Sequence, residues 1–267
     1  MERMNRVSFM DVCGRFFRPP VYGYWFVVRV YVVLACLAFV SYQLIAWLTV
    51  GQGELLTVLD GMDRRAMLAL NFAGTPAVDA FWYGFSHKLT WIPLALTVVC
   101  TVVAWHPGTL RDKIVFLLSV AFLVVLFDQV SSGIIKPLAG RLRPSHDPAL
   151  ADLLHYVNGY RGGYYGFVSS HAANAVGVVT VLCTVFRDRL TRVVLVFFAL
   201  CMCYSRIYLG VHYPGDVLCG ALLGWGIARG MLSCFGTSMR AYSTYRRPRV
   251  LLMVFAATFL ILLFQGQ

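Results

Sequence analysis

The chain has 267 residues, of which 59% are hydrophobic and only 13% are charged. Soluble domains carry about a quarter charged residues, so this composition excludes an ordinary soluble protein. Several apolar runs reach the roughly 20 residues that a helix needs to cross a bilayer, which predicts an integral membrane protein. The net charge of +11 could attract nucleic acid. Most Lys and Arg residues, however, lie in short loops between apolar runs, and no nucleic-acid-binding motif is present, so we expect the membrane bilayer and no nucleic acid as a partner.

The first half of the chain combines apolar runs with two amphipathic segments. Residues 1–22 mix arginines with apolar side chains, which predicts an interfacial segment on the inner face that Pro19-Pro20 ends. The elements expected next are a helix over 24–48, an amphipathic stretch over 61–72 that lies flat on the outer surface, and helices over 78–105 and 114–135.

The longest polar stretch, 136–170, separates these elements from a second group of apolar runs. The helices expected there cover 171–186, 193–211 and 215–232, and a last run, 250–265, is just long enough to form a seventh helix. We therefore predict an all-α fold, a polytopic transmembrane helical bundle with a six-helix core and one further C-terminal hydrophobic segment. At this length, residues 1–267 form one transmembrane domain.

The distribution of positive charge predicts the orientation of this bundle. With the N-terminus inside, the inner segments hold more Lys and Arg residues than the outer ones, as the positive-inside rule requires. We expect a multi-pass protein of the cell (inner) membrane with a cytoplasmic N-terminus. The polar stretch 136–170 and the loop near residue 212 then both lie on the periplasmic or extracellular side.

Three of the cationic side chains in these outer segments could bind phosphate together. A phosphate dianion needs several donors around its oxygens, and Arg and Lys supply them. Lys136, Arg143 and Arg206 come from two separate segments, as a pocket between helices requires. Each one alone is explained equally well as an interfacial anchor that extends to lipid headgroups. Charges at membrane depth are costly, however, and three of them beside two histidines indicate function.

The two histidines have neighbours that suit acid–base and nucleophilic chemistry. His171 opens a predicted helix just after Ser169-Ser170, where free backbone N–H groups favour an anion, and it could donate a proton to a leaving oxygen. His212 precedes Asp216 by four residues. A carboxylate that orients one imidazole nitrogen leaves the other free to attack, although Asp216 is also explained as the N-cap of the next helix.

These residues resemble the motifs of the type 2 phosphatidic acid phosphatase family, a superfamily that also contains vanadium-dependent haloperoxidases. The family pattern is Lys-x6-Arg-Pro, then Pro-Ser-Gly-His, then Ser-Arg-x5-His-x3-Asp. The first motif matches at Lys136, Arg143 and Pro144, and the third at Ser205, Arg206, His212 and Asp216. The second matches at Ser169 and His171, with Val168 and Ser170 in place of Pro and Gly.

The resemblance implies a mechanism without a metal or cofactor. His212, oriented by Asp216, would attack phosphorus and form a phosphohistidine, and His171 would protonate the leaving oxygen and then activate water. The phosphate would be held by Lys136, Arg143, Ser169, Ser170 and Arg206. Lys88 and Arg141 are weaker predictions for contact with the substrate.

The implied function is hydrolysis of a lipid phosphate from the outer leaflet: phosphatidic acid, phosphatidylglycerol phosphate, undecaprenyl diphosphate or lipid A phosphate. Two alternatives stay open at this point. One is a haloperoxidase-like oxidant that binds vanadate in the same pocket. The other is a non-enzymatic phosphate-binding transporter, since charged residues also line transport paths.

Overall fold

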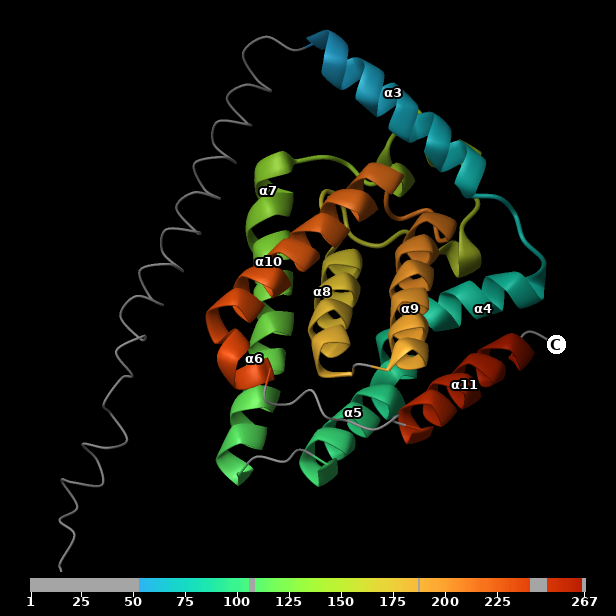
Figure 1. The fold of residues 1–267 in the computed structure, drawn as a ribbon. Helices are drawn as coiled ribbons and strands as arrows, with labels where there is room; N and C mark the ends of the chain where they lie inside the picture. The colour runs from blue at the N-terminus through green and yellow to red at the C-terminus, as the bar shows by residue number, and fades with distance from the viewer. Residues whose placement is uncertain (1–52, 106–108, 187, 241–248, 266–267) are drawn as a thin grey trace, which may run out of the picture. The chain divides into compact units, whose positions relative to one another are not determined.

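The computed structural model describes residues 53–105, 109–186, 188–240 and 249–265 (Figure 1). The expected segments 1–22 and 24–48 lie outside these residues. The chain divides into two compact units, Met1–Val58 and Leu59–Gln267, and the contacts below belong to the second. In the described part of the chain, all regular elements are helices, and one isolated bridge pairs Leu142 with Tyr165. The expected all-α class is confirmed.

The helices follow the predicted order. Their bounds are α3 (Gly53–Leu70), α4 (Pro76–Ser86), η1 (Lys88–Trp91), α5 (Ile92–Trp105), α6 (Leu110–Asp128), η2 (Gln129–Ile135), α7 (Lys136–Ala139), η3 (Pro144–His146), η4 (Ala151–Leu153), η5 (Val157–Gly159), α8 (Ser170–Val185), α9 (Arg189–Tyr208), α10 (Pro214–Arg240) and α11 (Arg249–Phe264). Helix η2 has π-helical hydrogen bonding and joins α6 to α7. The expected seventh run, 250–265, is the helix α11, and it packs against α4 and α5.

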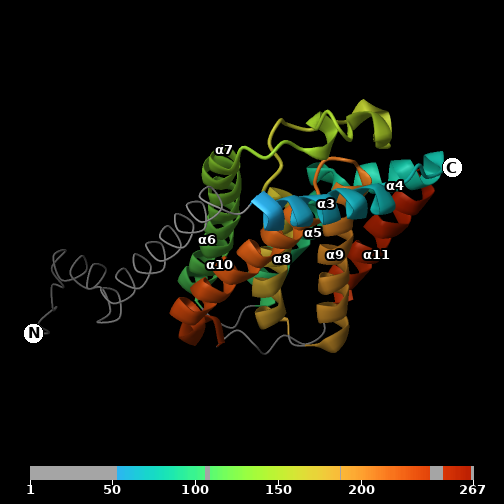
Figure 2. The same ribbon diagram turned by 90° about the horizontal axis from the view of Figure 1, so that it is seen from above.

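Helix α8 is the centre of the bundle. It packs against α6, α9 and, most extensively, α10 (Figures 1 and 2). Gly220 and Gly224 of α10 lie one turn apart where the two backbones meet. A Cβ atom on Gly220 would collide with the backbone of Ser169, and one on Gly224 with that of Ala173. Small residues at this spacing permit such close helix packing in membranes, and here they bring the start of α8 against α10.

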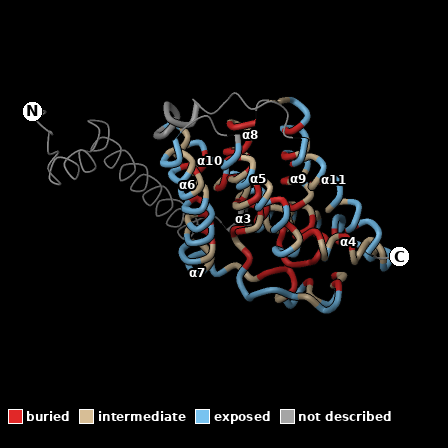
Figure 3. The backbone as a smooth tube through the Cα atoms, turned by 90° about the horizontal axis from the view of Figure 1, so that it is seen from below, coloured by how far each residue is buried: buried red, intermediate tan, exposed pale blue. Residues whose placement is uncertain are grey.

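The surface of the bundle is apolar and several polar groups are buried, the reverse of a soluble protein. Helix α6 exposes Leu118 and Phe122, and α11 exposes Met253 and Phe264 (Figure 3). Within the described residues, two helical stretches, Leu110–Ala139 and Arg189–Tyr208, have the length and hydropathy to cross a bilayer. A third span results if α4 and the helix after it are taken together, and α8 and α11 are shorter apolar helices.

The single helix predicted over 78–105 is wrong, because the chain bends by 68° between α4 and the following helix. The break lies at His87, whose backbone is extended. Two side chains beyond the break replace the lost helical hydrogen bonds. The Thr90 hydroxyl donates to the carbonyl of Gly84 at 2.7 Å, and the Trp91 indole donates to that of Phe85 at 2.7 Å. The bend is therefore stabilised by local hydrogen bonds at the point where Ser86-His87-Lys88 interrupts the apolar run.

Met67, in the last turn of α3, and Asn71, just after the helix, contact the bundle. Met67 is fully buried against Tyr213 and Val217. The amide of Asn71 donates to the carbonyls of Tyr208 at 2.7 Å and His155 at 3.1 Å. Its oxygen accepts the backbone N–H of His155 at 2.8 Å. These contacts hold α3, the polar loop and the end of α9 together.

Candidate active site

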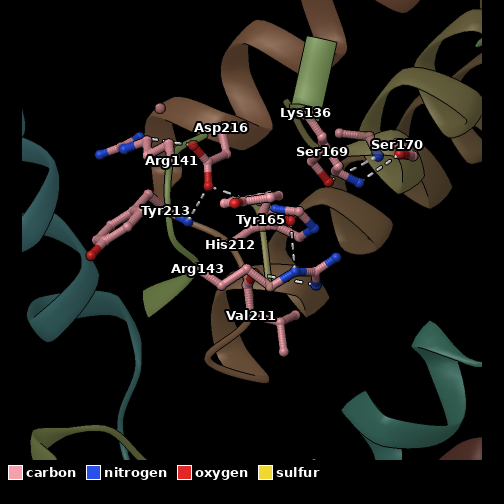
Figure 4. Close-up of polar contacts among 12 residues, drawn as sticks. Lys136, Arg141, Arg143, Tyr165, Ser169, Ser170, Val211, His212, Tyr213 and Asp216 are labelled. Atoms are coloured by element: carbon pink, nitrogen blue, oxygen red, sulfur yellow. Dashed lines mark hydrogen bonds and ion pairs between the residues drawn. The ribbon is translucent and has the colours of Figure 1, made fainter. Parts of the chain in front are cut away.

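The three sequence motifs meet at one end of the bundle, where α7 ends, α8 begins and a short loop joins α9 to α10 (Figures 2 and 4). The long loop 140–169 runs across this end. Its bridge between Leu142 and Tyr165 brings the first motif beside the segment that leads to the second. The backbone N–H of Ser169 donates to the carbonyl of Asp216 at 2.9 Å, which joins the second motif to the third.

Serines surround the ammonium group of Lys136. Its Nζ donates to the hydroxyl of Ser170 at 2.9 Å, and that hydroxyl lies 2.7 Å from the Ser132 hydroxyl on η2. Ser169 is fully buried and caps α8, because its hydroxyl accepts the backbone N–H of Ala172. Ser170 therefore binds the lysine, in the position where the family pattern has glycine, and Ser169 orders the N-terminus of α8.

The two arginines of the motifs are buried and bound by neutral partners. Arg143 is 9% exposed, and its Nε donates to the carbonyl of Tyr165 at 3.0 Å. Arg206 is 2% exposed; it donates to the hydroxyls of Ser86 and Tyr160. Burial, together with the positive charge of Arg206, lowers the pKa of Arg143. Two guanidinium groups thus lie within range of each other's charge, which is unfavourable unless an anion binds between them.

His212 and Asp216 face each other in the interior. His212 is 1% exposed and Asp216 is fully buried, and 3.6 Å separates Nδ1 of the histidine from Oδ2 of the aspartate. The same oxygen accepts the backbone N–H of Tyr213 at 3.1 Å. Burial, and then the charges of Arg143 and Arg206, lower the pKa of His212 well below 6.5. The imidazole is therefore neutral at pH 7. A proton on Nδ1, the nitrogen that faces Asp216, would leave a lone pair on the far nitrogen, Nε2.

His171 is the second residue of α8 and is partly buried. The charged or titratable groups that act on it electrostatically include Arg206, His212, Lys88 and Lys136. The two histidines thus lie within range of the same cations, as a site with two imidazoles around one anion requires.

Of the two weaker predictions, substrate contact by Lys88 stays a prediction, whereas Arg141 has other partners. Lys88 begins η1 at the bend and is exposed, and its charge reaches His171. The guanidinium of Arg141 instead forms ion pairs with Asp60, Asp63 and Asp216.

Sequence reasoning missed five residues of the site. They are Ser132 beside Lys136, Ser86 and Tyr160 on Arg206, and Asp60 and Asp63 on Arg141. Of these five, only Asp60 and Asp63 could have been noticed in the sequence, because they are acidic residues at the start of the amphipathic outer segment. Ser86 and Tyr160 lie 120 and 46 residues from Arg206 along the chain, and no local pattern connects them.

The site offers donors for an anion. It combines Lys, Arg and Ser side chains with the N-terminus of α8, all of which bind oxyanions. Among the described residues, no group of three or more His, Cys, Asp or Glu side chains could hold a metal ion. The apolar bundle and this cluster of cationic side chains with two histidines define a class, the integral membrane proteins that bind a phosphate group.

Comparison with known proteins identifies the family. The model of the PAP2 superfamily matches residues 114–240, which contain all three motifs. The chain is 35% identical over 170 residues to a lipid A 4'-phosphatase of Bacteroides thetaiotaomicron, which covers 62% of this chain and 73% of that protein. It is 32% identical over 163 residues to a lipid A 4'-phosphatase of Porphyromonas gingivalis. This alignment covers 61% of this chain and 68% of that protein.

A solved structure supports the fold. The transmembrane PAP2-type phosphatidylglycerolphosphate phosphatase of Bacillus subtilis is 21% identical, with a TM-score of 0.50 over 74% of this chain and 94% of that one. The chain belongs to the PAP2 superfamily. It is a membrane phosphatase and groups with the lipid phosphatases of that superfamily.

Proposed function

We propose that this phosphatase removes a phosphate monoester from the sugar headgroup of a lipid A-type glycolipid at the outer face of the cell membrane. One observation carries the proposal of a phosphate site. Within the described residues, Lys136, Arg143 and Arg206 form no ion pair with a carboxylate, although the two arginines are buried. Buried cations without a counter-ion are costly, and a phosphate dianion would supply the missing charge.

The geometry supports attack by His212. The Nε2 lone pair of the neutral imidazole forms a bond to phosphorus, and the bond between phosphorus and the lipid oxygen breaks. His171, protonated when the phosphate dianion binds beside it, donates its proton to that oxygen, which leaves as the lipid alcohol. The neutral His171 then takes a proton from water, whose oxygen bonds to phosphorus while the bond between phosphorus and Nε2 of His212 breaks, and inorganic phosphate is released. Asp216 stabilises the positive charge that His212 acquires, while Lys136, Arg143 and Arg206 stabilise the phosphoryl oxygens in the transition state.

The choice of substrate rests on the relatives and on the surface of the bundle. Both curated relatives described above are named lipid A 4'-phosphatases. The three motifs lie at one end of an apolar bundle, which suits a substrate whose acyl chains stay in the bilayer. The other lipid phosphates of the family, phosphatidic acid, phosphatidylglycerol phosphate and undecaprenyl diphosphate, are the competitors that the experiment must separate.

A substrate panel tests the proposal. Full-length protein is purified in detergent, and phosphate release is measured from lipid A, phosphatidic acid, phosphatidylglycerol phosphate and undecaprenyl diphosphate. We expect the highest kcat/KM for lipid A, with loss of the phosphate on the distal sugar visible by mass spectrometry. A higher kcat/KM on another lipid would overturn the choice of substrate and leave the chemistry intact.

The chemistry has its own control. His212→Ala should reduce phosphate release from every lipid by at least about 1000-fold, because the nucleophile is lost. His146→Ala removes a histidine from η3 in the same loop region and should keep near-wild-type rates. Equal activity of His212→Ala and wild type would refute the phosphohistidine mechanism.

The membrane orientation needs a separate test. Leu153 lies in the loop 140–169 and is 67% exposed, so a cysteine at this position is accessible to solvent. In intact cells with a permeable outer membrane, Leu153→Cys should react with a membrane-impermeant maleimide above the background of the parent chain. Reaction only after lysis would place the loop in the cytoplasm and contradict the proposed topology.

A further inference from the structure

The guanidinium of Arg141 is bound by three carboxylates. Its NH1 donates to Oδ1 of Asp216 at 2.8 Å, and its NH2 donates to Oδ1 of Asp60 at 2.9 Å and to Oδ2 of Asp63 at 2.8 Å. Its Cζ lies 4.2 Å from the centre of the Tyr213 ring. Figure 4 shows Arg141 directed toward Asp216, whereas Arg143 lies beside His212.

The two oxygens of Asp216 have different partners. Oδ1 accepts from Arg141, whereas Oδ2 faces Nδ1 of His212 and accepts the N–H of Tyr213. An ion pair on Oδ1 and a backbone hydrogen bond on Oδ2 fix the plane of a fully buried carboxylate. The direction in which Oδ2 faces the imidazole therefore depends on the position of Arg141.

Asp63 of α3 binds both Arg141 and the backbone next to Asp216. Its Oδ1 accepts the backbone N–H of Gly215 at 2.7 Å, one residue before Asp216, and its Oδ2 accepts from Arg141. The side chain thus fixes both the backbone that carries Asp216 and the guanidinium that binds it. Asp60 completes the group and is itself paired with Arg64 at 2.6 Å.

We propose that Arg141, anchored by Asp60 and Asp63 of α3, is a positioning residue that holds Asp216 against His212, and that it is not a phosphate ligand. The inference rests on the proposed phosphohistidine chemistry. It replaces the sequence-based expectation that Arg141 contacts substrate, and it makes α3 part of the catalytic machinery.

The electrostatics agree with this role. Burial alone would lower the pKa of Arg141, but Asp216 and Asp63 raise it above its ordinary value, so the guanidinium stays charged. A phosphate dianion would have to compete with three carboxylates for both terminal nitrogens. Arg143 presents the opposite case, because its hydrogen-bond partners are the backbone carbonyls of Tyr165 and Val211.

The test compares Arg141→Gln with Arg143→Gln in the full-length protein, on the lipid phosphate that the panel selects. For Arg141→Gln, kcat should fall about 10- to 100-fold, because a misplaced catalytic group costs turnover. Its KM and its inhibition constant for inorganic phosphate should stay within about threefold of wild type. Arg143→Gln should raise both constants at least about tenfold. Asp63→Asn should also lower kcat with little change in KM or the inhibition constant, but by less than Arg141→Gln. Arg141→Lys should recover part of kcat.

A double-mutant cycle measures the energetic coupling between Arg141 and Asp216, which a purely structural role of Arg141 would not produce. Arg141→Gln should add less than about threefold to the defect of Asp216→Asn, because both changes disable one unit. Additive losses, or an inhibition constant for phosphate raised as in Arg143→Gln, would overturn the proposal. If Arg141→Gln does not fold, the same comparison with Asp63→Asn decides the question.

The failure of this inference can be told apart from failure of the proposed function. An active His212→Ala would refute the phosphohistidine chemistry whatever Arg141 does. An inactive His212→Ala with additive Arg141 and Asp216 variants would refute the positioning role alone.

Discussion

Gly166 lies where the loop 140–169 passes the catalytic pair, and adding one methyl group there should misplace Asp216. A Cβ atom on Gly166 would lie 2.7 Å from Oδ2 of Asp216 and 3.3 Å from Cγ of Arg143. An ordinary contact begins at 3.4 Å, so the loop and the carboxylate must separate by about 0.7 Å. Displacements approaching 1 Å in an active site cost on the order of 100-fold in rate, and we expect Gly166→Ala to lower kcat about 10- to 100-fold.

Gly163 provides the matched control, because it lies in the same loop and a Cβ atom there would meet nothing within 4 Å. Neither glycine has a positive φ, so alanine fits the backbone at both positions. Initial rates of phosphate release in detergent give kcat and KM, and a thermal melt of each variant checks folding. The reasoning fails if Gly166→Ala, folded like wild type, turns over substrate within about twofold of Gly163→Ala.

Two further predictions concern stability. Because the pKa of His212 is lowered well below 6.5 in the fold, the unfolded chain binds a proton there first. The Tm should therefore decrease as the pH is lowered from about 6.5. Protonation of His212 contributes at most about 1.4 kcal/mol per pH unit to this loss of stability. Melts from pH 7.5 to 5.5 should show a shallower decline for His212→Asn, and identical slopes would contradict the pKa shift. Asn71→Ala leaves the backbone groups of His155 and Tyr208 without their partner. It should cost about 2–4 kcal/mol and lower Tm by roughly 5–10 °C; an unchanged Tm would mean that Asn71 does not hold α3.

The sequence predicted the helices best where apolar runs and polar breaks coincide, as at α8, α9 and α11. It failed at His87, because the interruption Ser86-His87-Lys88 is short enough to fit within one helix, and the hydrogen bonds of Thr90 and Trp91 that stabilise the bend have no local sequence pattern. The π-helical turn of η2, just before Lys136, was missed for a related reason. Its residues are compatible with an α-helix, and the difference lies in backbone hydrogen bonding alone.

The site was predictable to the extent that its residues recur at fixed spacings. Lys136, Arg143, Arg206, His212 and Asp216 were found in this way. The partners that hold them were not, because Ser86, Tyr160 and Asp63 approach only after folding. The amphipathic stretch over 61–72 was recognised, but the direction of its charged face depends on Arg141, far along the chain.

Helix α3 directs Asp60 and Asp63 to Arg141 and leaves Leu59, Met62 and Leu70 exposed. In a membrane, acyl chains are the medium that covers such a face. We therefore expect the lipid around α3 to influence how this helix holds the catalytic carboxylate. The turnover rate should then depend on the composition of the surrounding leaflet, and a detergent micelle that covers this helix incompletely should slow an otherwise intact enzyme.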